Sequence, residues 1–297
     1  MSMIDSTKMP AQAEPLDPLP VYLDVRATFA ERFLFGEGLE IGALHQPLAI
    51  PSHARARYVD RMRSEELRQE YPELTDWNLT EVSIVDDGEQ LTTIPAESQD
   101  FIIANHFLEH TENPIGTIEN HLGKLKPGGI LFYAVPDKRF TFDFKRQPTP
   151  LNHMVADYEE GPERSRHQHY TEWARWVEEG SGPPGQAEEQ RIERRAQVLE
   201  DAKYSIHMHV WTQAEFLELI LDMRKRFDEA FDIEAAARTG IEFVVVLRKR
   251  GPLPTPPPPP APPGATPGRV RFERWKFRAR RILSAARNKV RRWRARS

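Results

Sequence analysis

Several apolar runs in the first half of the chain end in polar residues that could bind a small ligand. Asp60 follows one run, and a carboxylate there can accept hydrogen bonds from both hydroxyl groups of a ribose. Asp87, which precedes Gly88, can accept a hydrogen bond from the exocyclic amine of an adenine. Gly42 has no side chain and lets the backbone approach a ligand closely. His106 follows another run, and an imidazole can act as a base near neutral pH.

These residues need a scaffold that brings several strand ends together. Short β-type runs alternate with stretches able to form helices or loops, such as 64–71 and 115–125. This alternation predicts right-handed βαβ units and a parallel sheet. A ligand of such a sheet binds at the carboxyl ends of its strands, near the switch point beside the first strand. The β-type runs are 39–44, 57–60, 81–86, 100–105 and 130–135.

The segments around and after the fifth run have different patterns. Lys-Pro-Gly-Gly at 126–129 predicts a turn that leads into the fifth strand. Residues 137–210 are too long for an ordinary loop and are mostly polar, so we expect a helical insertion. An amphipathic helix should follow Thr212, and 232–248 should form a β-hairpin.

The composition favours a globular protein. Of the 297 residues, 39% are hydrophobic and 29% are charged, and no apolar run is long enough to span a membrane. The chain has no cysteine, which excludes disulfides and thiolate nucleophiles and fits a reducing compartment. Because the first residues also lack the pattern of a signal peptide, we expect a cytoplasmic protein.

The charge is unevenly distributed. Residues 269–297 carry a net charge of +12 and the rest of the chain −16, against −4 for the whole chain. A helix over 272–293 would place an apolar stripe with Trp275 and Trp293 among the basic residues. This pattern is typical of a helix at an anionic membrane surface, which would be the inner face of the membrane, or of a protein-docking helix. Nucleic acid is a weaker alternative partner, because phosphates attract the same charges. The remaining alternatives need no external partner: the helix docks on the acidic body of the chain, or the tail is disordered.

The series of strand ends resembles the class I S-adenosylmethionine-dependent methyltransferases, particularly the group often labelled type 11. The resemblance covers roughly residues 36–137, and the helix and hairpin at 211–250 match the family's sheet-closing end. The order and spacing of the motifs together are specific, although no one of them is decisive. The matching segments are Leu-Glu-Ile-Gly-Ala at 39–43, Tyr-Val-Asp at 58–60, Asp-Asp-Gly-Glu-Gln-Leu at 86–91, Ser-Gln-Asp-Phe-Ile-Ile-Ala-Asn-His-Phe-Leu-Glu-His at 98–110 and Leu-Lys-Pro-Gly-Gly-Ile-Leu at 125–131.

The resemblance implies an α/β fold: a Rossmann-like, seven-stranded, mostly parallel sheet with helices on both faces, a closing β-hairpin and a helical insertion after the fifth strand. The methyltransferase domain would cover 21–250, with the acceptor-side insertion at 137–210. A disordered lead-in is expected at 1–20, a proline-rich linker at 251–268 and a basic amphipathic helix at 269–297.

The resemblance also implies a donor, S-adenosylmethionine, and a place for each of its parts. Asp60 with its neighbour Arg61 would hold the ribose, and Asp87 with Gly88 the adenine. The remaining expected donor residues are Glu40, Gly42 and Ala43 beside the methionine part, and Asn105 and His106 close to the sulfonium.

One departure from the family's pattern concerns the loop after the first strand. The family usually has two or three glycines there, whereas this chain has only Gly42 in Gly-Ala-Leu-His-Gln-Pro at 42–47. The donor has no phosphate to cradle, so one glycine can suffice. The same lack argues against a nucleotide-dependent dehydrogenase, which needs more glycines for its pyrophosphate. It leaves a non-catalytic, methyltransferase-like scaffold as an alternative.

Histidines are the candidate bases for a hydroxyl acceptor. The candidates are His106, His153, His169, His207 and His209, and we favour His106 because it borders the donor methyl group. We expect Glu109 and His110 to begin or pack the next helix rather than act in chemistry. The pairs at 167–169 and 207–209 have spacings that could suggest a metal, but no nearby acidic cluster completes a site, so we expect no metal.

The sequence thus predicts a methyltransferase that modifies a small molecule or glycan by in-line displacement, and the expected acceptor atom is oxygen. A nucleic-acid methyltransferase using the basic tail is a further alternative. The acidic body argues against it, as does the absence of an Asn-Pro-Pro-Tyr type sequence after the fourth strand.

Overall fold

The computed structural model describes residues 24–70, 76–178 and 185–252. The expected lead-in (1–20), all but the first two residues of the proline-rich linker (251–268) and the basic helix (269–297) lie outside the described residues.

Seven strands of the described chain form one sheet in the order β3-β2-β1-β4-β5-β7-β6. Neighbouring strands pair in parallel except at β7, which is antiparallel to both β5 and β6. The expected Rossmann-like sheet with a closing hairpin is therefore confirmed. The strands are β1 (Gly36–Ile41), β2 (Ala54–Asp60), β3 (Ile84–Val85), β4 (Gln99–Asn105), β5 (Leu125–Pro136), β6 (Phe231–Thr239) and β7 (Glu242–Lys249).

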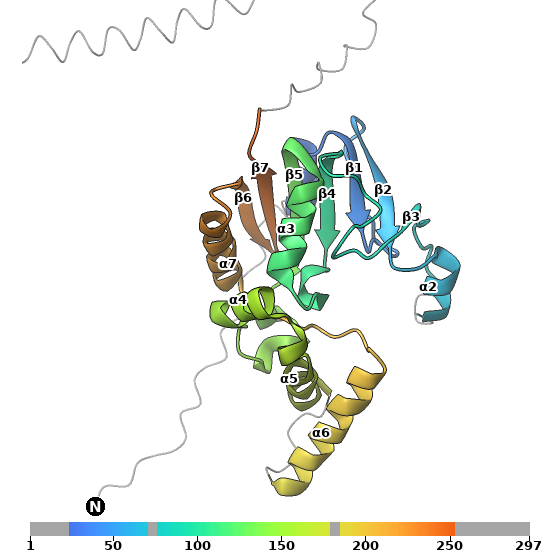
Figure 1. Ribbon diagram of the computed structural model, residues 1–297. Helices are drawn as coiled ribbons and strands as arrows, with labels where there is room; N and C mark the ends of the chain where they lie inside the picture. The colour runs from blue at the N-terminus through green and yellow to red at the C-terminus, as the bar shows by residue number, and fades with distance from the viewer. Residues whose placement is uncertain (1–23, 71–75, 179–184, 253–297) are drawn as a thin grey trace, which may run out of the picture. The chain divides into compact units, whose positions relative to one another are not determined.

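Helices cover both faces of the sheet. Apolar residues of α3, α4 and α7 pack on one face in a large buried cluster, and α1 packs on the other face. Figure 1 shows α4, α5 and α6 gathered at the end of the sheet toward which β1, β2 and β4 point. The helices are α1 (Val25–Phe33), α2 (Ser64–Glu70), α3 (Pro114–Lys124), α4 (Leu151–Glu160), α5 (Glu163–Trp173), α6 (Gln186–Asp201) and α7 (Gln213–Arg226).

Local sequence signals explain where these helices begin. The Asn113 side chain accepts a hydrogen bond from the backbone of Gly116 and, with Pro114 in the first turn, starts α3. Thr212 and Glu215 form a reciprocal capping box at the start of α7, as the sequence predicts.

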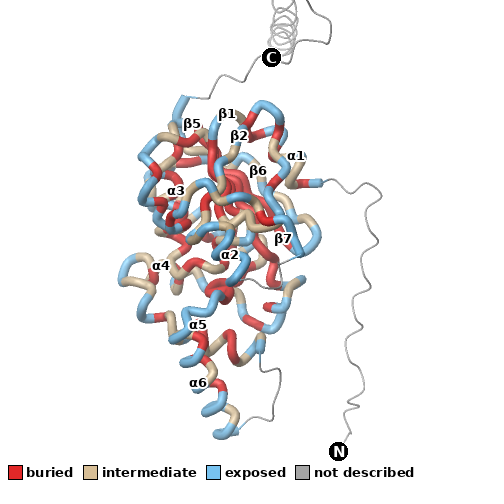
Figure 2. The backbone as a smooth tube through the Cα atoms, turned by 90° about the vertical axis from the view of Figure 1, so that its right-hand side faces the viewer, coloured by how far each residue is buried: buried red, intermediate tan, exposed pale blue. Residues whose placement is uncertain are grey.

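The insertion between β5 and α7 is helical, as expected, and has a small core of its own. Apolar residues of α5, α6 and the segment before α7 form this core, including Trp173, Ile192 and Ile206. The rest of α6 is largely exposed, whereas β5 and β7 are largely buried (Figure 2). None of the helices in the described part of the chain is long and apolar enough to cross a membrane.

The turn predicted at 126–129 is wrong in one respect. The fifth strand begins at Leu125, before the glycines, and the segment forms an irregularity inside the strand. The pairing register shifts between Gln99 and Phe101, and Gly128 has a φ of 84°, which glycine adopts without strain.

Candidate active site

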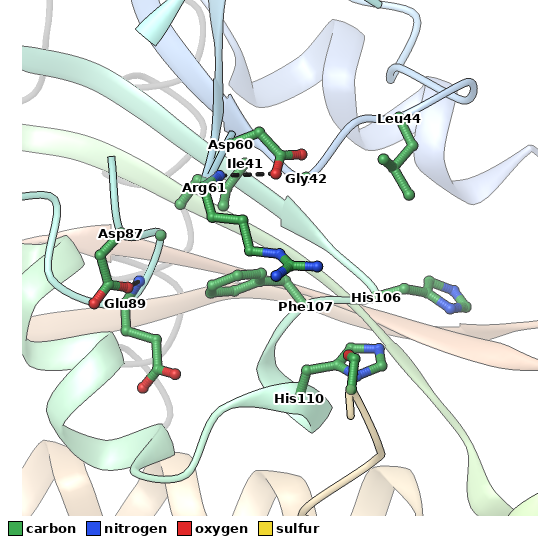
Figure 3. Close-up of a pocket in the computed structure, with 12 residues that line it drawn as sticks. Ile41, Gly42, Leu44, Asp60, Arg61, Asp87, Glu89, His106, Phe107 and His110 are labelled. Atoms are coloured by element: carbon green, nitrogen blue, oxygen red, sulfur yellow. Dashed lines mark hydrogen bonds between the residues drawn. The ribbon is translucent and has the colours of Figure 1, made fainter. Parts of the chain in front are cut away.

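Two adjoining cavities lie at the carboxyl ends of the parallel strands and share Gly42 and His106. The larger cavity measures 420 Å³, which is within the range of about 300–1,000 Å³ typical of small-molecule sites. The smaller measures 210 Å³. The larger is lined by Asp60, Arg61, Asp87 and Gly88, and the smaller by Glu40, Ala43 and Asn105. The structure therefore brings all nine expected donor residues together around the two cavities. Figure 3 shows the larger cavity, with Asp60, Asp87 and His106 among the residues that line it.

Two glycines shape the backbone around the larger cavity, for different reasons. Gly42 has a φ of 65°, so it needs the left-handed conformation that most side chains avoid. Gly88 has no such φ, but a Cβ atom there would lie 2.7 Å from both Ile41 and Phe107. The loop after β1 thus needs a glycine because of its backbone conformation, and the loop after β3 needs one because its neighbours leave no room for a side chain.

Asp60 ends β2 at the wall of the larger cavity. Its Oδ1 accepts a hydrogen bond of 2.8 Å from the backbone N–H of Arg61 (Figure 3). Burial raises the pKa of Asp60 above its ordinary value, while that hydrogen bond opposes the rise. The Arg61 side chain forms an ion pair with Glu70 of α2.

The loop after β3 assigns different roles to two neighbouring aspartates. Asp86 is buried and accepts hydrogen bonds from the backbone and hydroxyl groups of Thr92 and Thr93, which fix the loop. Asp87 is exposed and lines the cavity, as does Glu89, whose pKa is raised to about 7 by burial and by the charge of Asp87. Only Asp87 of the two aspartates is therefore available to a ligand.

Buried His121 of α3 supports the same loop, although no pattern in the sequence indicates this role. One ring nitrogen lies 2.8 Å from the carbonyl oxygen of Gly88, and the other lies 2.9 Å from the hydroxyl of Tyr133. Burial lowers the pKa of His121 to about 4, so the ring is neutral at pH 7. A neutral imidazole can donate to the carbonyl and accept from the hydroxyl, which satisfies both neighbours.

The smaller cavity has buried polar atoms with no partner among the described residues. Glu40 is 1% exposed, and its Oε1 accepts from the backbone N–H of Leu48. Its Oε2 has no hydrogen bond, and neither do the amide oxygen and nitrogen of Asn105. Burial raises the pKa of Glu40 to about 7. Unsatisfied buried groups are costly, so these atoms indicate a place for a polar ligand.

His106 lines both cavities and pairs with a carboxylate that is distant from it in the sequence. Its Nε2 is 2.6 Å from Oε2 of Glu242, the first residue of β7. Glu242 also forms an ion pair with Arg26 of α1. Although burial acts to raise it, hydrogen bonds from His106 and Arg26 lower the pKa of Glu242. The His106 side chain is 37% exposed, so a ligand can reach the ring.

His110 does not begin the next helix as expected, and it lies at the wall of the larger cavity. Residues Leu108–His110 form a short 3-10 helix that ends before α3, and His110 lines the larger cavity. Glu109, His110 and His207 place possible metal-ligand atoms within 4.8 Å of one another. Both carboxylate oxygens of Glu109 are buried without a hydrogen bond among the described residues, and Asp143 lies 2.6 Å from Nδ1 of His207.

The other candidate bases lie outside both cavities. His153, His169 and His209 gather around Asp157, with ligand atoms within 4.8 Å of one another. The expectation that no acid stands near these histidines is therefore wrong. Asp157 is ten or more residues away from every histidine of the two pairs that suggested a metal, so the spacing of the pairs does not indicate it.

A comparison with family models identifies the class of protein that has this fold and site. A model described as a methyltransferase domain matches residues 22–221, which is more than half of the chain. The chain belongs to this family of methyltransferase domains, and the expected family is thereby confirmed. A search of curated proteins finds no match.

Solved structures with similar folds include several methyltransferases. One from Aquifex aeolicus, described as S-adenosylmethionine-dependent, is 13% identical with a TM-score of 0.39, covering 75% of this chain and 86% of that one. Another from Methanosarcina mazei is 18% identical with a TM-score of 0.37, covering 80% of this chain and 100% of the other. A Thermotoga maritima protein described as a possible histamine N-methyltransferase is 14% identical with a TM-score of 0.39, covering 72% and 83%.

Proposed function

We propose that this methyltransferase uses S-adenosylmethionine to methylate a hydroxyl group of a small-molecule or saccharide acceptor. The observation that carries the proposal is the gathering of all nine expected donor residues around the two adjoining cavities. Bound S-adenosylmethionine would supply an electrophilic methyl group on a sulfonium.

The polar groups of the two cavities fit the parts of this donor. In the smaller cavity, the unpartnered oxygen of Glu40 can accept from an ammonium group, and the Asn105 amide can bond to a carboxylate or an ammonium. In the larger cavity, Asp60 offers a carboxylate to a ribose and Asp87 one to an adenine amine. Phe107, beside Gly88, gives this end an apolar wall.

His106 is the proposed base. With Nε2 donating to Glu242, its Nδ1 keeps a lone pair that can take the proton of an acceptor hydroxyl. The Glu242 carboxylate stabilises the resulting imidazolium and fixes the tautomer, as the carboxylates of catalytic triads do. Arg26 on the other side of Glu242 keeps that carboxylate ionised.

Aromatic rings extend from the larger cavity to the surface and support an acceptor with an apolar or ring-shaped face. His110 lines the cavity, its ring centroid lies 4.8 Å from that of His207, and His207 lies 4.8 Å from exposed Phe142. Both His207 and Phe142 belong to the 137–210 insertion, which follows β5 at the same end of the sheet. We therefore assign this insertion to acceptor binding.

Calorimetric titration with S-adenosylmethionine and S-adenosylhomocysteine tests the donor part of the proposal. Both ligands should bind the unmodified protein, and Asp60→Asn should weaken both by at least about tenfold, since it removes a charge-assisted hydrogen bond to the ribose. Asp228→Asn makes the same chemical change at an exposed residue after α7 and should bind as the unmodified protein does. Failure of the folded protein to bind either ligand would overturn the proposal.

An acceptor screen tests the second part. Radiolabelled donor should transfer label to a hydroxyl compound or saccharide, and the label should be stable as an ether. Transfer to nitrogen acceptors alone, or to nucleic acid alone, would contradict the proposed acceptor class while leaving the donor assignment intact.

A further inference from the structure

Three histidines and one aspartate meet inside the insertion, away from the two cavities. Helix α4 supplies His153 and Asp157, which stand four residues apart and therefore on one helix face. Helix α5 supplies His169, and the segment before α7 supplies His209. Three separate parts of the chain thus converge on one point.

The three imidazoles present the same nitrogen to one carboxylate oxygen. Oδ2 of Asp157 lies 3.1 Å from Nε2 of His153, 4.0 Å from Nε2 of His169 and 3.9 Å from Nε2 of His209. The Nε2 atoms of His153 and His169 are 3.1 Å apart. The planes of the three rings make angles of 72–78° with one another.

This centre is buried, and one oxygen of its carboxylate, Oδ2 of Asp157, lacks a hydrogen-bond donor among the described residues. Asp157, His169 and His209 are at most 4% exposed. Oδ2 of Asp157 accepts no hydrogen bond of adequate geometry from any described residue, and Nδ1 of His209 has no partner there either. A buried carboxylate oxygen without a donor is costly, and a cation among the four groups would remove that cost.

We propose that His153, Asp157, His169 and His209 bind a zinc ion. Three neutral imidazoles and one carboxylate form a four-ligand set that suits tetrahedral zinc in a closed, structural site. In such a site neighbouring ligand atoms are about 3.3 Å apart, because each lies about 2.0–2.1 Å from the metal. The four separations given above, 3.1–4.0 Å, differ from this spacing by about 0.7 Å or less.

The surroundings of the four ligands resemble those of metal sites. Ser165 donates a hydrogen bond of 2.6 Å to Oδ1 of Asp157, which orients the carboxylate so that Oδ2 faces the imidazoles. Buried Trp211 stacks on the ring of His209. The Nε2 of His209 also lies 3.3 Å from the carbonyl oxygen of Glu112, a contact that the metal bond would replace.

A small opening gives an ion access to the site. A cavity of 150 Å³ is lined by His153 and Asp157, together with Ser165 and Gln168. Zinc bound here would join α4, α5 and the segment before α7, and so hold three parts of the insertion together.

Metal titration of the full chain, prepared without a polyhistidine tag, tests the proposal. The apoprotein should bind one equivalent of Zn²⁺ in competition with a chromophoric chelator. Co²⁺ at the same site should give the intense visible absorption of a tetrahedral centre. Zinc at about a hundredfold excess over its dissociation constant should raise the melting temperature by about 5–10 °C.

Substitutions assign the ligands. Asp157→Asn and His169→Asn should each weaken Zn²⁺ binding by at least about a hundredfold and remove the Co²⁺ absorption. Loss of a residue that only hydrogen-bonds to a metal ligand typically lowers metal affinity by about 10–100-fold, and loss of a ligand itself should lower it more. His167→Asn is the matched control, because His167 also lies on α5 but pairs with Glu193 and Glu200 outside the cluster. It should bind zinc as the unmodified protein does.

Three results would overturn the proposal: no stoichiometric binding by the folded protein, equal binding after Asp157→Asn and His169→Asn, or binding lost only in His207→Asn. The last result would place the metal at Glu109, His110 and His207 instead. If the buried substitutions prevent folding, two measurements still test the proposal. His153→Gln, at the partly exposed ligand, should weaken Zn²⁺ binding, and the unmodified protein should show the Co²⁺ absorption of a tetrahedral site.

Discussion

Nε2 of His106 lies 2.6 Å from Oε2 of Glu242, although 136 positions separate the two residues in the chain. The pair joins the end of β4 to the start of β7, and both residues are close to the cavities that hold the expected donor residues. His106 adopts a left-handed φ of 51°, which is uncommon outside glycine. This conformation is consistent with a side chain held in place for function.

Removing the charge of Glu242 should impair methyl transfer more than donor binding. Glu242→Gln keeps the shape but no longer stabilises an imidazolium, so kcat should fall by about 10²-fold or more. The measurement is the steady-state rate with an acceptor from the screen, alongside calorimetry with S-adenosylmethionine. Glu119→Gln, at an exposed residue of α3, is the control and should leave both unchanged. A rate that matches the unmodified protein would exclude Glu242 from positioning the base.

The affinity for S-adenosylmethionine should rise with pH up to about 7 and then level off. Burial raises the pKa of Glu40 from 4.5 to about 7, so the carboxyl is mostly protonated below that pH. The donor's ammonium favours the ionised form, and binding therefore releases a proton below pH 7. Calorimetric dissociation constants between pH 5.5 and 8.5 measure this dependence.

Two variants separate the carboxyl groups that titrate in that range. Glu40→Gln should flatten the pH dependence, because the titrating group beside the ammonium is gone. Glu89→Gln should keep most of it, although the pKa of Glu89 is also raised to about 7, because Glu89 lies in the other cavity. A full pH dependence in Glu40→Gln would show that the ammonium does not bind there.

Acid should destabilise the domain through His121. The pKa of this residue is lowered from 6.5 to about 4, so the unfolded chain binds its proton first as the pH falls. Neutral His121 contributes fully to the free energy of unfolding above pH 6.5, and this contribution is lost as the pH falls to about 4. The loss amounts to about 3 kcal/mol at most. Urea unfolding at several pH values should show a shallower loss in His121→Gln, whereas the control His53→Gln, at an exposed residue, should follow the unmodified protein. Parallel curves for all three proteins would refute this prediction.

Gly88→Ala should weaken donor binding by about tenfold or more. The new Cβ atom would lie 2.7 Å from Ile41 and Phe107, so the loop that carries Asp87 must move. Gly123→Ala provides the comparison, because a Cβ atom there meets nothing within 4 Å on α3. That change should leave binding intact and raise the free energy of unfolding by about 0.5–1 kcal/mol. Equal donor affinity in the two variants would show that the close packing at Gly88 is not required.

The strand ends could be predicted from sequence because they depend on local patterns. Asp60, Asp87 and His106 each follow an apolar run, and parallel strands bring such ends to one edge of a sheet. The sequence predicts the turn at 126–129 outside the strand, since a proline and two glycines usually interrupt one. Leu125, which precedes the glycines, nevertheless pairs with Gln99 of β4, so the strand begins earlier than predicted.

The partners of these residues could not be predicted because no local pattern encodes them. Glu242 reads as an ordinary polar residue at a hairpin, and only the fold brings it to His106. Asp157 reads likewise as one polar residue of an amphipathic helix, and only helix packing surrounds it with imidazoles. Side-chain groups assembled from distant segments become visible only when the chain is folded.

The reversed direction of β7 has a consequence for synthesis of the chain. Because β7 runs against its neighbours, its first residue, Glu242, lies at the edge of the sheet where the parallel strands end. The expected donor residues all precede position 107, whereas the carboxylate that holds the base is made more than a hundred residues later. A ribosome-bound chain that has not yet released this strand therefore lacks the carboxylate that pairs with His106, the base in our proposal.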